Sequence, residues 1–446
     1  MNANPPTGAE APAFTPYQKF AIAMLAFLQF SIVLDFMIMS PLGALLMPAL
    51  GISTRQFGLA VSAYAFSAGI AGILAAGFAD KFDRKKLLLF FYGGFIFGTL
   101  LCGLATTYWF LIFARIVTGI FGGVIGSISM AIIADLFPMQ VRGRVMGFVQ
   151  SAFAASQVLG LPIGLWLGTH TRWGWHAPFL MIVAVSAAVA VVILTKLQPI
   201  TGHLALQTTS NPIAHLFKTV SQGRYLQAFL ATTLLATGGF MLMPFASAFS
   251  VNNLGIDLDH LPSVYLATGI ASFAAGPLIG RLSDKVGKYN LFVIGSLAAI
   301  VIVNIYCNLG VTPLTGVIAI NIVLFIAITA RMIGSQALAS GVPDLQDRGA
   351  FMAVNNSVAQ LAGGVAAFVA GIIVIQPAGA ANQPLQRYNV LGWVVSVAIA
   401  ITIGLLYPIN KMVMAKQAKG GPGMGPGGMA HGAGAPAGAG KPANAA

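Results

Sequence analysis

Charged residues are scarce in this chain. They make up 7% of the 446 residues, while apolar residues make up 57%, and a typical soluble domain carries about 25% charged residues. Acidic residues are the rarest, with 10 Asp and Glu against 23 Lys and Arg. This composition excludes an ordinary water-soluble fold and predicts a protein that lies in a lipid bilayer.

Residues for metal, redox and nucleotide chemistry are also few. All six His fall in predicted loops, span ends or tails, and the chain has no P-loop pattern that could cradle phosphates. The two cysteines, Cys102 and Cys307, lie within apolar stretches and are expected to pack as small side chains. We therefore expect no enzyme activity, no cofactor, no metal and no use of ATP.

Long apolar stretches are abundant, and twelve of them reach the roughly 20 residues that a helix needs to cross the hydrocarbon core. Their length and lack of strict alternation favour helices over membrane strands. The predicted fold is therefore an all-α membrane protein with twelve transmembrane helices. The stretches cover roughly 20–47, 57–78, 87–105, 109–133, 145–168, 177–195, 225–250, 262–281, 290–308, 314–338, 350–375 and 389–409.

Two loops of the chain occur twice. The loop AGFADKFDRKK at 76–86 returns as GRLSDKVGK at 280–288, about 204 positions later. The loop MQVRGRVMG at 139–147 returns as LQDRGAFMA at 345–353, at an offset of about 206. Two independent loops at nearly one offset predict two pseudo-symmetric six-helix bundles, an arrangement typical of secondary transporters.

The repeats and the composition together predict five regions. The ends are rich in Pro, Gly and Ala, which cannot bury a core, and are expected to be disordered. The regions are a cytoplasmic N-terminus (1–18), an N-terminal bundle (19–195), a cytoplasmic linker (196–223), a C-terminal bundle (224–410) and a cytoplasmic tail (411–446).

Basic residues gather on one side of the predicted topology. With both termini inside, only Arg55, Arg172 and Arg387 fall outside, and Arg115 and Arg331 lie within spans. All other Lys and Arg are then cytoplasmic, as the positive-inside rule requires. The basic charge therefore follows membrane topology and not nucleic-acid binding, and we expect a multi-pass protein of the inner (cytoplasmic) membrane.

The duplicated loop resembles the signature of the major facilitator superfamily, G-x-x-x-D-[RK]-x-G-x-[RK]-[RK]. It departs from the signature at Ala76 and Asp83, where the family usually has glycine. The stretches ARIVTGIFGG at 114–123 and WGWHAPF at 173–179 are similar to other patterns of that family. Within the family, the chain looks most like the bacterial drug:proton antiporter and arabinose-efflux-permease-like group. The helix-5 motif of that group matches Gly160, Pro162 and Gly164, but Leu161 separates the glycine from the proline.

The resemblance implies a conformational latch at the cytoplasmic side. Asp80 is expected to meet the positive N-terminus of the eleventh helix when that side is shut. The alternative is that the basic residues only fix topology, although topology alone does not explain the aspartates. The expected latch residues are Asp80, Lys81, Arg84, Arg142, Asp284, Lys285, Arg348 and Gly349.

Asp35 is the only acidic residue predicted to lie in the middle of a span. A carboxylate at membrane depth is costly, which makes a functional role the default hypothesis, here as a proton acceptor. The alternative is a structural aspartate paired with an arginine or with a helix end. Its counterpart in the second half, 205 positions later, is Phe240.

Two arginines also lie within spans. The resemblance implies that Arg115, in the fourth helix, couples proton or substrate movement, with a structural role as the alternative. Its counterpart in the second half is Asn321. Arg331 lies deeper in the tenth helix, where it either lines the cavity or snorkels or caps a helix.

These observations predict a proton-coupled efflux transporter that works by alternating access on a small, largely apolar or cationic molecule. Alternatives are a proton-coupled importer or uniporter of a sugar or organic anion and, more remotely, a non-transporting membrane sensor. The expected partners are the substrate, protons and membrane lipids, with no nucleic acid, and a monomer is expected. The expected cavity residues are Gln29, Phe30, Met39, Met241, Phe245, Asn321, Phe325 and Arg331.

Overall fold

The structure is a computed structural model that describes residues 14–75, 81–201, 222–344, 348–376 and 383–419. Within these ranges, twelve helical segments are long and apolar enough to cross a membrane. The expected all-α membrane fold is therefore confirmed. The first helix begins at Pro16 and the last ends at Lys419, so both extend beyond the bundle limits of 19 and 410 expected from the sequence.

The first half supplies six spans. Two of them are interrupted, because the first continues after a short turn into α2, and the fifth changes from α6 through a π-helical turn, η2, into α7. The elements are α1 (Pro16–Ile38), α2 (Gly43–Leu50), α3 (Thr54–Ala75), α4 (Arg84–Gly103), α5 (Tyr108–Leu136), α6 (Met139–Ala155), η2 (Ser156–Gly160), α7 (Leu161–His170), η3 (Gly174–His176) and α8 (Ala177–Lys196).

The second half supplies the other six spans. Its first span is also interrupted, because α10 gives way to the 3-10 turn η5 and then to α11. The elements are α10 (Gly223–Phe240), η5 (Met243–Phe245), α11 (Ala246–Asn252), η6 (Leu258–His260), α12 (Leu261–Val286), α13 (Lys288–Cys307), α14 (Leu314–Ala339), α15 (Arg348–Ile373) and α16 (Tyr388–Lys419).

The packing inside each half follows one scheme. In the first half α4 packs on α5 and α8, and α1 packs on α6 and α8. In the second half α13 packs on α14 and α16, and α10 packs on α15 and α16. This equivalence matches α1 with α10, α4 with α13 and α5 with α14, so the two halves are structural repeats, as the duplicated loops predict.

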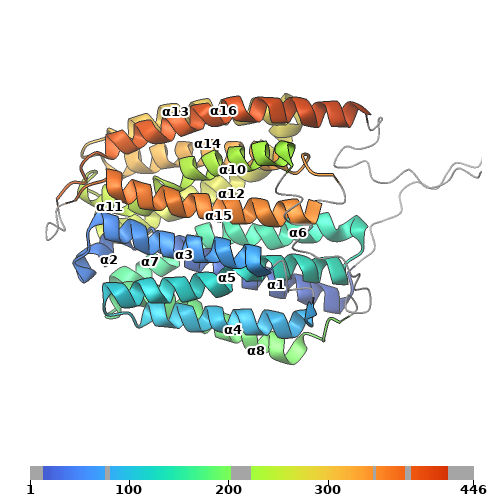
Figure 1. Cartoon of the computed structure of the whole chain (residues 1–446). Coiled ribbons are helices and arrows are strands. Elements are labelled where there is room, and N and C mark those ends of the chain that lie inside the picture. The colour runs from blue at the N-terminus through green and yellow to red at the C-terminus, as the bar shows by residue number, and fades with distance from the viewer. Residues whose placement is uncertain (1–13, 76–80, 202–221, 345–347, 377–382, 420–446) are drawn as a thin grey trace, which may run out of the picture.

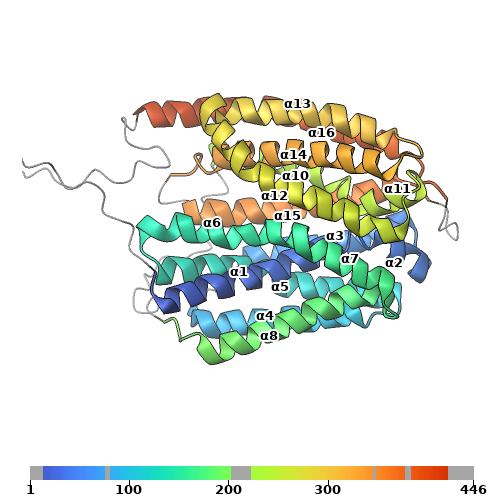
Figure 2. The same ribbon diagram turned by 180° about the vertical axis from the view of Figure 1, so that it is seen from behind.

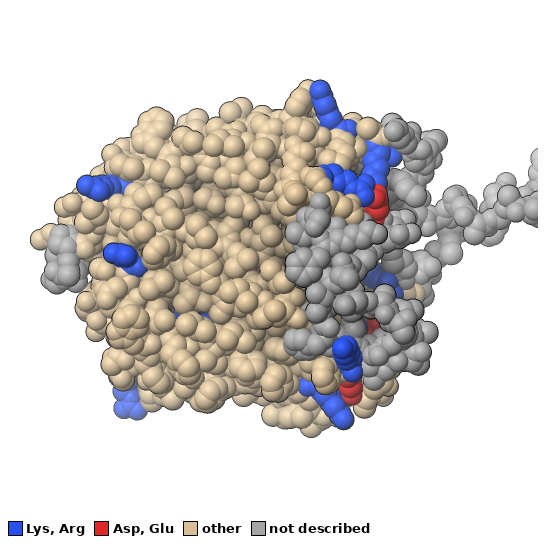
Figure 3. Space-filling view, viewed as in Figure 1, with Lys and Arg blue, Asp and Glu red and all other residues tan. Residues whose placement is uncertain are grey.

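The two halves lie side by side and their helices run along a common direction (Figure 1, Figure 2). We call the end at which α1 begins and α8 and α16 end the linker end, and the end that carries α2 and α11 the loop end. In Figure 3 the visible acidic side chains lie only at the linker end, and the broad middle is almost free of charge. This distribution matches a protein whose middle faces lipid.

Local capping explains several helix boundaries. Thr15 forms a capping box with Gln18 at the start of α1, and Thr107 caps α5 through the amide of Phe110. Asp83 caps α4 by accepting from the amide of Lys85. Gly287 separates α12 from α13 with φ 93°, a conformation that favours glycine.

The most extensive contact between the halves joins α3 and α15. A Cβ atom at Gly58 would lie 2.7 Å from the Ala367 carbonyl oxygen, and one at Gly72 would lie 3.0 Å from Ser357 Oγ. The two backbones therefore approach closely because small residues line the contact. The register is antiparallel, so it brings the end of α3 towards the start of α15.

Candidate functional site

The two residues predicted to couple protons form an ion pair inside the first half. Asp35 lies near the end of α1 and Arg115 in the first part of α5, with Arg115 Nη1 2.9 Å from Asp35 Oδ2. Neither side chain is exposed. The same Nη1 also donates to the Asp35 carbonyl oxygen at 3.5 Å. The same contact therefore fits both roles expected for Asp35, that of a proton acceptor and that of a structural partner of an arginine.

Two further side chains complete this site, and the sequence did not identify them. Thr99 of α4 donates its hydroxyl to Asp35 Oδ1 at 3.1 Å. The ring of Tyr64 from α3 faces the Arg115 guanidinium, whose central carbon lies 4.5 Å from the ring centroid. Four helices of the first half therefore converge on a single buried charge pair.

The chemistry of the pair follows from its burial. Removing one partner of a buried ion pair costs about 3–5 kcal/mol, because the other charge remains without compensation. Nε and Nη2 of Arg115 have no hydrogen-bond partner within the described residues. A proton added to Asp35 would leave Arg115 without its carboxylate and would therefore carry this cost.

The second half has no such pair at the equivalent positions. Asn321, the counterpart of Arg115, is buried and donates to the Val317 carbonyl of its own helix at 2.9 Å. Phe240, the counterpart of Asp35, packs against Phe36 of the first half. The charge pair is therefore specific to the first half, as the sequence offset predicts.

Arg331 lies in α14 and is only 3% exposed. Its Nε donates to Ser296 Oγ of α13 at 3.1 Å. A snorkelling side chain would reach water, so that alternative is wrong for the described conformation. The side chain lies instead within the second half, among α10, α13 and α14.

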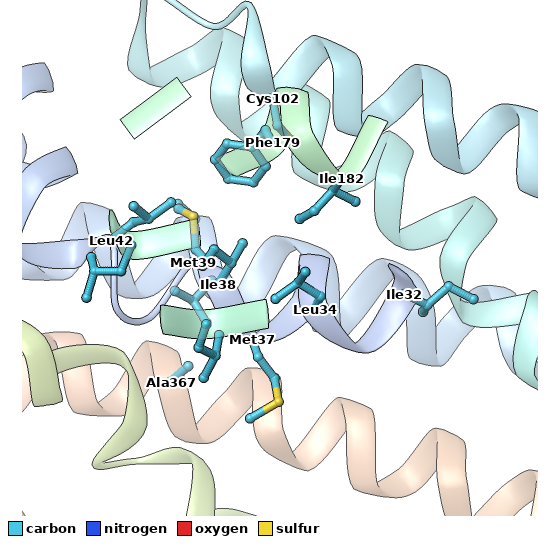
Figure 4. Close-up of a cluster of buried hydrophobic side chains, with 14 of the residues drawn as sticks. Ile32, Leu34, Met37, Ile38, Met39, Leu42, Cys102, Phe179, Ile182 and Ala367 are labelled. Atoms are coloured by element: carbon cyan, nitrogen blue, oxygen red, sulfur yellow. The ribbon is translucent and has the colours of Figure 1, made fainter. Parts of the chain in front are cut away.

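Several predicted cavity residues are almost completely buried in the described conformation. Met39, Met241 and Phe245 are at most 1% exposed, and the Phe245 ring lies 5.8 Å from that of Phe57. Figure 4 shows Met39 among the buried side chains of the first span, with Phe179 and Ile182 to one side and Ala367 to the other. Gln29 and Phe325 are half-buried. The sequence could not predict this because transmembrane helices are apolar on all faces.

An apolar cavity of about 160 Å³ lies between α1, the fifth span and α8. Phe30 is the one predicted cavity residue that lines it. Leu34, the residue before Asp35, also lines it, whereas Asp35 and Arg115 do not. The lining residues are Phe30, Ser31, Leu34, Gly160, Ile163, Met181, Ile182 and Val185.

The helix-5 motif contains the π-helical turn η2. A π-turn is an irregularity within an α-helix that is often found at functional sites. In the family motif the proline directly follows the glycine, whereas Pro162 lies two positions after Gly160, and the spacing of Gly160 and Gly164 is unchanged. A Cβ at Gly160 would lie 2.6 Å from a methyl group of Leu34, and one at Gly164 would lie 2.7 Å from a methyl group of Ile38. The glycine row therefore packs the fifth span onto α1, beside Asp35, with Pro162 in the first turn of α7.

The two halves are held together at the loop end and in mid-span. Ser40 of the first half donates its hydroxyl to the Met243 carbonyl, and Ser247 donates to the Ser40 carbonyl at 2.8 Å. Thr54 donates to the Val374 carbonyl at 2.6 Å, and in mid-span Ser62 donates to the Gly364 carbonyl at 2.9 Å. These hydrogen bonds describe a conformation in which the loop end is shut.

The predicted latch residues are only partly described. Asp80 lies outside the described residues, and for Asp284, Arg348 and Gly349 only the backbone is described, near the end of α12 and at the start of α15. Lys81 and Lys285 are exposed.

Two basic residues of the predicted latch bind within the first half. Arg84 is buried and pairs with Asp135 of α5 at 3.2 Å, a partner that the sequence did not predict. Arg142 donates to the carbonyls of Phe137 and Ala134 and so caps the end of α5. At least part of their role is therefore to hold helix ends in place.

Comparison with known proteins places the chain among transporters. Residues 25–367 and 228–432 match the sequence profile of the Major Facilitator Superfamily. The uncharacterised MFS-type transporter YceJ of Bacillus subtilis (strain 168) is 30% identical over 267 residues, 59% of this chain and 66% of YceJ. A probable sugar efflux transporter of Helicobacter pylori (strain G27) is 23% identical over 58% of this chain and 68% of its own.

A solved structure has the same fold. It is a bacterial homologue of the human lysosomal transporter Spinster, in an inward-facing and unoccupied conformation, with a TM-score of 0.71 and 16% identity. The match covers 90% of this chain and 99% of the homologue. At that identity the likeness concerns the fold alone.

Proposed function

Because the chain belongs to the Major Facilitator Superfamily, whose members are transporters and not enzymes, we propose that it is a proton-coupled secondary transporter that exports a small organic molecule. The observation that carries this proposal is the buried ion pair of Asp35 and Arg115. It places the only mid-span acid of the sequence where its charge state is linked to helix packing.

The proposed cycle uses this link. When Asp35 takes a proton from outside, Arg115 loses its carboxylate partner and the contact between α1 and α5 weakens. Release of the proton to the inside restores the pair. Thr99 donates a hydrogen bond to the same carboxylate, so α4 also takes part in this contact. Proton binding to Asp35 would thus shift the equilibrium between the two conformations, as alternating access requires.

The ion pair also bears on the chemical class of the substrate. A cationic substrate would need a free carboxylate, whereas Asp35 is already neutralised by Arg115. The apolar character of the walls remains, including the cavity beside Leu34. Of the two cargo classes expected from the sequence, the cationic one therefore loses support, and a molecule with an apolar body keeps it.

The direction of transport rests on the resemblance of the chain to efflux permeases and on its likeness to a relative named as a probable sugar efflux transporter. A proton-coupled importer or uniporter of a sugar or organic anion is the second candidate, and it differs from the proposed function in the direction of transport. Export against a gradient from loaded vesicles would separate the two.

We place the linker end in the cytoplasm, because the basic residues of the sequence gather there, and the protein in the inner membrane. In this orientation the shut loop end faces outwards and the described conformation faces inwards. The antiparallel register of α3 and α15 supports a latch between Asp80 and the start of α15, which would form when the linker end closes.

The proposal is tested in proteoliposomes that contain the purified protein and a pH-sensitive dye. A compound that stabilises the protein in a thermal screen serves as the substrate. Wild type should move protons when this compound is added, and Asp35→Asn, which cannot titrate, should not. Asp259→Asn, an exposed acid at the loop end, is the matched control. Substrate-induced proton movement that persists in Asp35→Asn would contradict the proposal.

A further inference from the structure

Arg331 is a buried cation whose hydrogen bonding is incomplete. Its Nε donates to Ser296 Oγ at 3.1 Å, while its Nη2 is fully buried and has no hydrogen-bond partner in the described part of the chain. Among the described residues, no carboxylate lies within ion-pair distance of it. The ring of Phe292 lies 5.9 Å from the guanidinium carbon, at the outer limit of a cation–π contact.

An uncompensated charge at this depth is costly. Taking an ion out of water costs several kcal/mol even after the protein relaxes, and a paired counter-ion is the usual compensation. Arg115, equally buried, has a carboxylate at 2.9 Å. Arg331 therefore lacks an anionic partner within the described residues. Ser296 is neutral and does not compensate its charge.

The neighbouring helix α10 presents a glycine to Arg331. In the first half α1 supplies the carboxylate for Arg115 of α5, and α10 is the equivalent of α1. Arg331 is not the counterpart of Arg115, which is Asn321, so the repeat matches the helices and not these side chains. Gly238 of α10 lies beside the guanidinium, because a Cβ there would lie 3.8 Å from Arg331 Nη2. At this point α10 therefore offers no side chain that could pair with Arg331.

The position is also next to a break in a helix. Gly238 and Gly239 precede the end of α10 at Phe240, after which the span continues through η5 into α11. A Cβ at Gly239 would meet no atom within 4 Å. A side chain can therefore be added at Gly239 without a clash.

We propose that Arg331, Ser296 and the surface of α10 at Gly238 form a binding site for the anionic group of the transported molecule, a carboxylate or a phosphate. The planar guanidinium matches both groups with two parallel hydrogen bonds, and Ser296 can donate its own hydroxyl hydrogen while accepting from Nε. This proposal rests on the proposed function and names the substrate class, an organic anion with an apolar body.

The first test supplies the anion from the protein. Gly238→Asp places a carboxylate opposite Nη2, and its Cβ makes only ordinary contacts, at 3.5 Å to Ile399 and 3.8 Å to Arg331. We expect Gly238→Asp to raise the thermal midpoint in the wild-type background and to lower it in the Arg331→Gln background. Gly239→Asp, the matched control, should show no such dependence on Arg331. Equal effects of Gly238→Asp in both backgrounds would overturn the proposal.

The second test measures binding of anions to the detergent-purified protein without any proton gradient. Inorganic phosphate, phenyl phosphate and benzoate are the probes, and benzyl alcohol is the neutral control of the same shape as benzoate. We expect at least one anion to raise the midpoint by about 2 °C or more. The shift should be lost in Arg331→Gln and in Gly238→Asp, and kept in Gly239→Ala. Anion shifts that are absent, or equal in wild type and Arg331→Gln, would overturn the site.

The experiments distinguish a failure of the anion site at Arg331 from a failure of the proposed proton-coupled function. Asp35→Asn should keep the anion-induced shift, because Asp35 lies in the other half of the protein, while it abolishes proton movement. Loss of the shift in Arg331→Gln together with intact proton coupling in the wild type supports both proposals. If anions raise the thermal midpoint of the wild type but the wild type moves no protons, the anion site is supported and the proton-coupled function is contradicted.

Discussion

Phe240 of α10 lies edge-on to Phe36 of α1, with the ring centroids 5.5 Å apart. The Phe36 ring is in turn 5.4 Å from that of Tyr64, whose face is turned to Arg115. Phe240 occupies the position that corresponds to Asp35 in the repeat. The residue that stands in place of the acid therefore helps to shut the ion pair off from the second half.

Phe240→Ala should open this barrier and let protons leak through the protein. Replacing a buried Phe by Ala costs about 3–5 kcal/mol in well-packed sites, and a half-buried ring should cost less. We expect faster dissipation of a pH gradient in proteoliposomes without any substrate. Phe273→Ala is the matched control because Phe273 is 59% exposed. A leak rate equal to that of wild type would show that these rings do not form the barrier.

The ion pair predicts strong coupling between its two residues. Asp35→Asn and Arg115→Gln should each destabilise the protein by about 3–5 kcal/mol, because each leaves a buried charge unpaired. The double variant should cost less than the sum of the two. Thermal midpoints of the four proteins in detergent measure this cycle, and additive effects would contradict a direct pair.

Gly58→Ala should weaken the closed loop end. The new methyl group would lie 2.7 Å from the Ala367 carbonyl oxygen and 3.1 Å from Gly371 Cα, both backbone atoms that cannot move aside easily. The conformation that opens the loop end should gain population. Labelling of a cysteine placed at Ser40 should then become faster than in wild type. Gly93→Ala, where a Cβ meets no atom within 4 Å, should leave the rate unchanged.

Asp344, in the loop after α14, joins α10 and α16 at the linker end. Its carboxylate lies 2.7 Å from Lys416 Nζ and 2.6 Å from Arg224 Nη2. Hydrogen bonds from Lys416 and then Arg224 hold the pKa of Asp344 below its ordinary value of 3.8. A lowered pKa stabilises the folded state above the ordinary value, and this stabilisation is lost as the pH falls through the lowered one.

Thermal midpoints measured at falling pH should show this effect. Below pH 4 the midpoint of wild type should fall more steeply than that of Asp344→Asn, which has no proton to gain. The difference should be modest because the Asp344 side chain is 44% exposed. Parallel curves would mean that the contacts of Asp344 contribute nothing to stability in solution.

Much of the fold was predictable because its signals are local. Span length, the duplicated loops and the lone mid-span acid all appear in the sequence, and the twelve spans and the repeated packing of α1 and α10 confirm the first two. From the sequence, a structural role for Asp35 could mean pairing with an arginine or with a helix end. The sequence does not decide between them because it does not orient two helices relative to each other.

The features that were missed depend on which face each helix presents. Thr99 and Tyr64 reach the ion pair from helices that are apolar all round, so no periodicity points to them. Arg84 looks like a loop residue in the sequence, but it pairs with Asp135, which lies 51 positions away. The π-turn lies next to a visible departure from the family motif, the proline at position 162 in place of 161, but this displacement does not by itself predict a π-turn.

The orientation of the protein is the last prediction. It rests on the gathering of Lys and Arg at the linker end, which the positive-inside rule assigns to the cytoplasm. A cysteine introduced at Asp257, an exposed loop-end residue, should react in intact cells with a reagent that does not cross membranes. A cysteine at Lys86, exposed at the linker end, should react only after the cells are permeabilised.

Both cysteine variants need a background in which Cys102 and Cys307 do not react. These two residues are buried, so the otherwise unchanged protein is the control and should remain unlabelled. The reverse pattern, with Lys86 labelled in intact cells and Asp257 only after permeabilisation, would invert the topology. In that case Asp35 would release protons to the opposite side, and the proposed direction of export would have to be reversed with it.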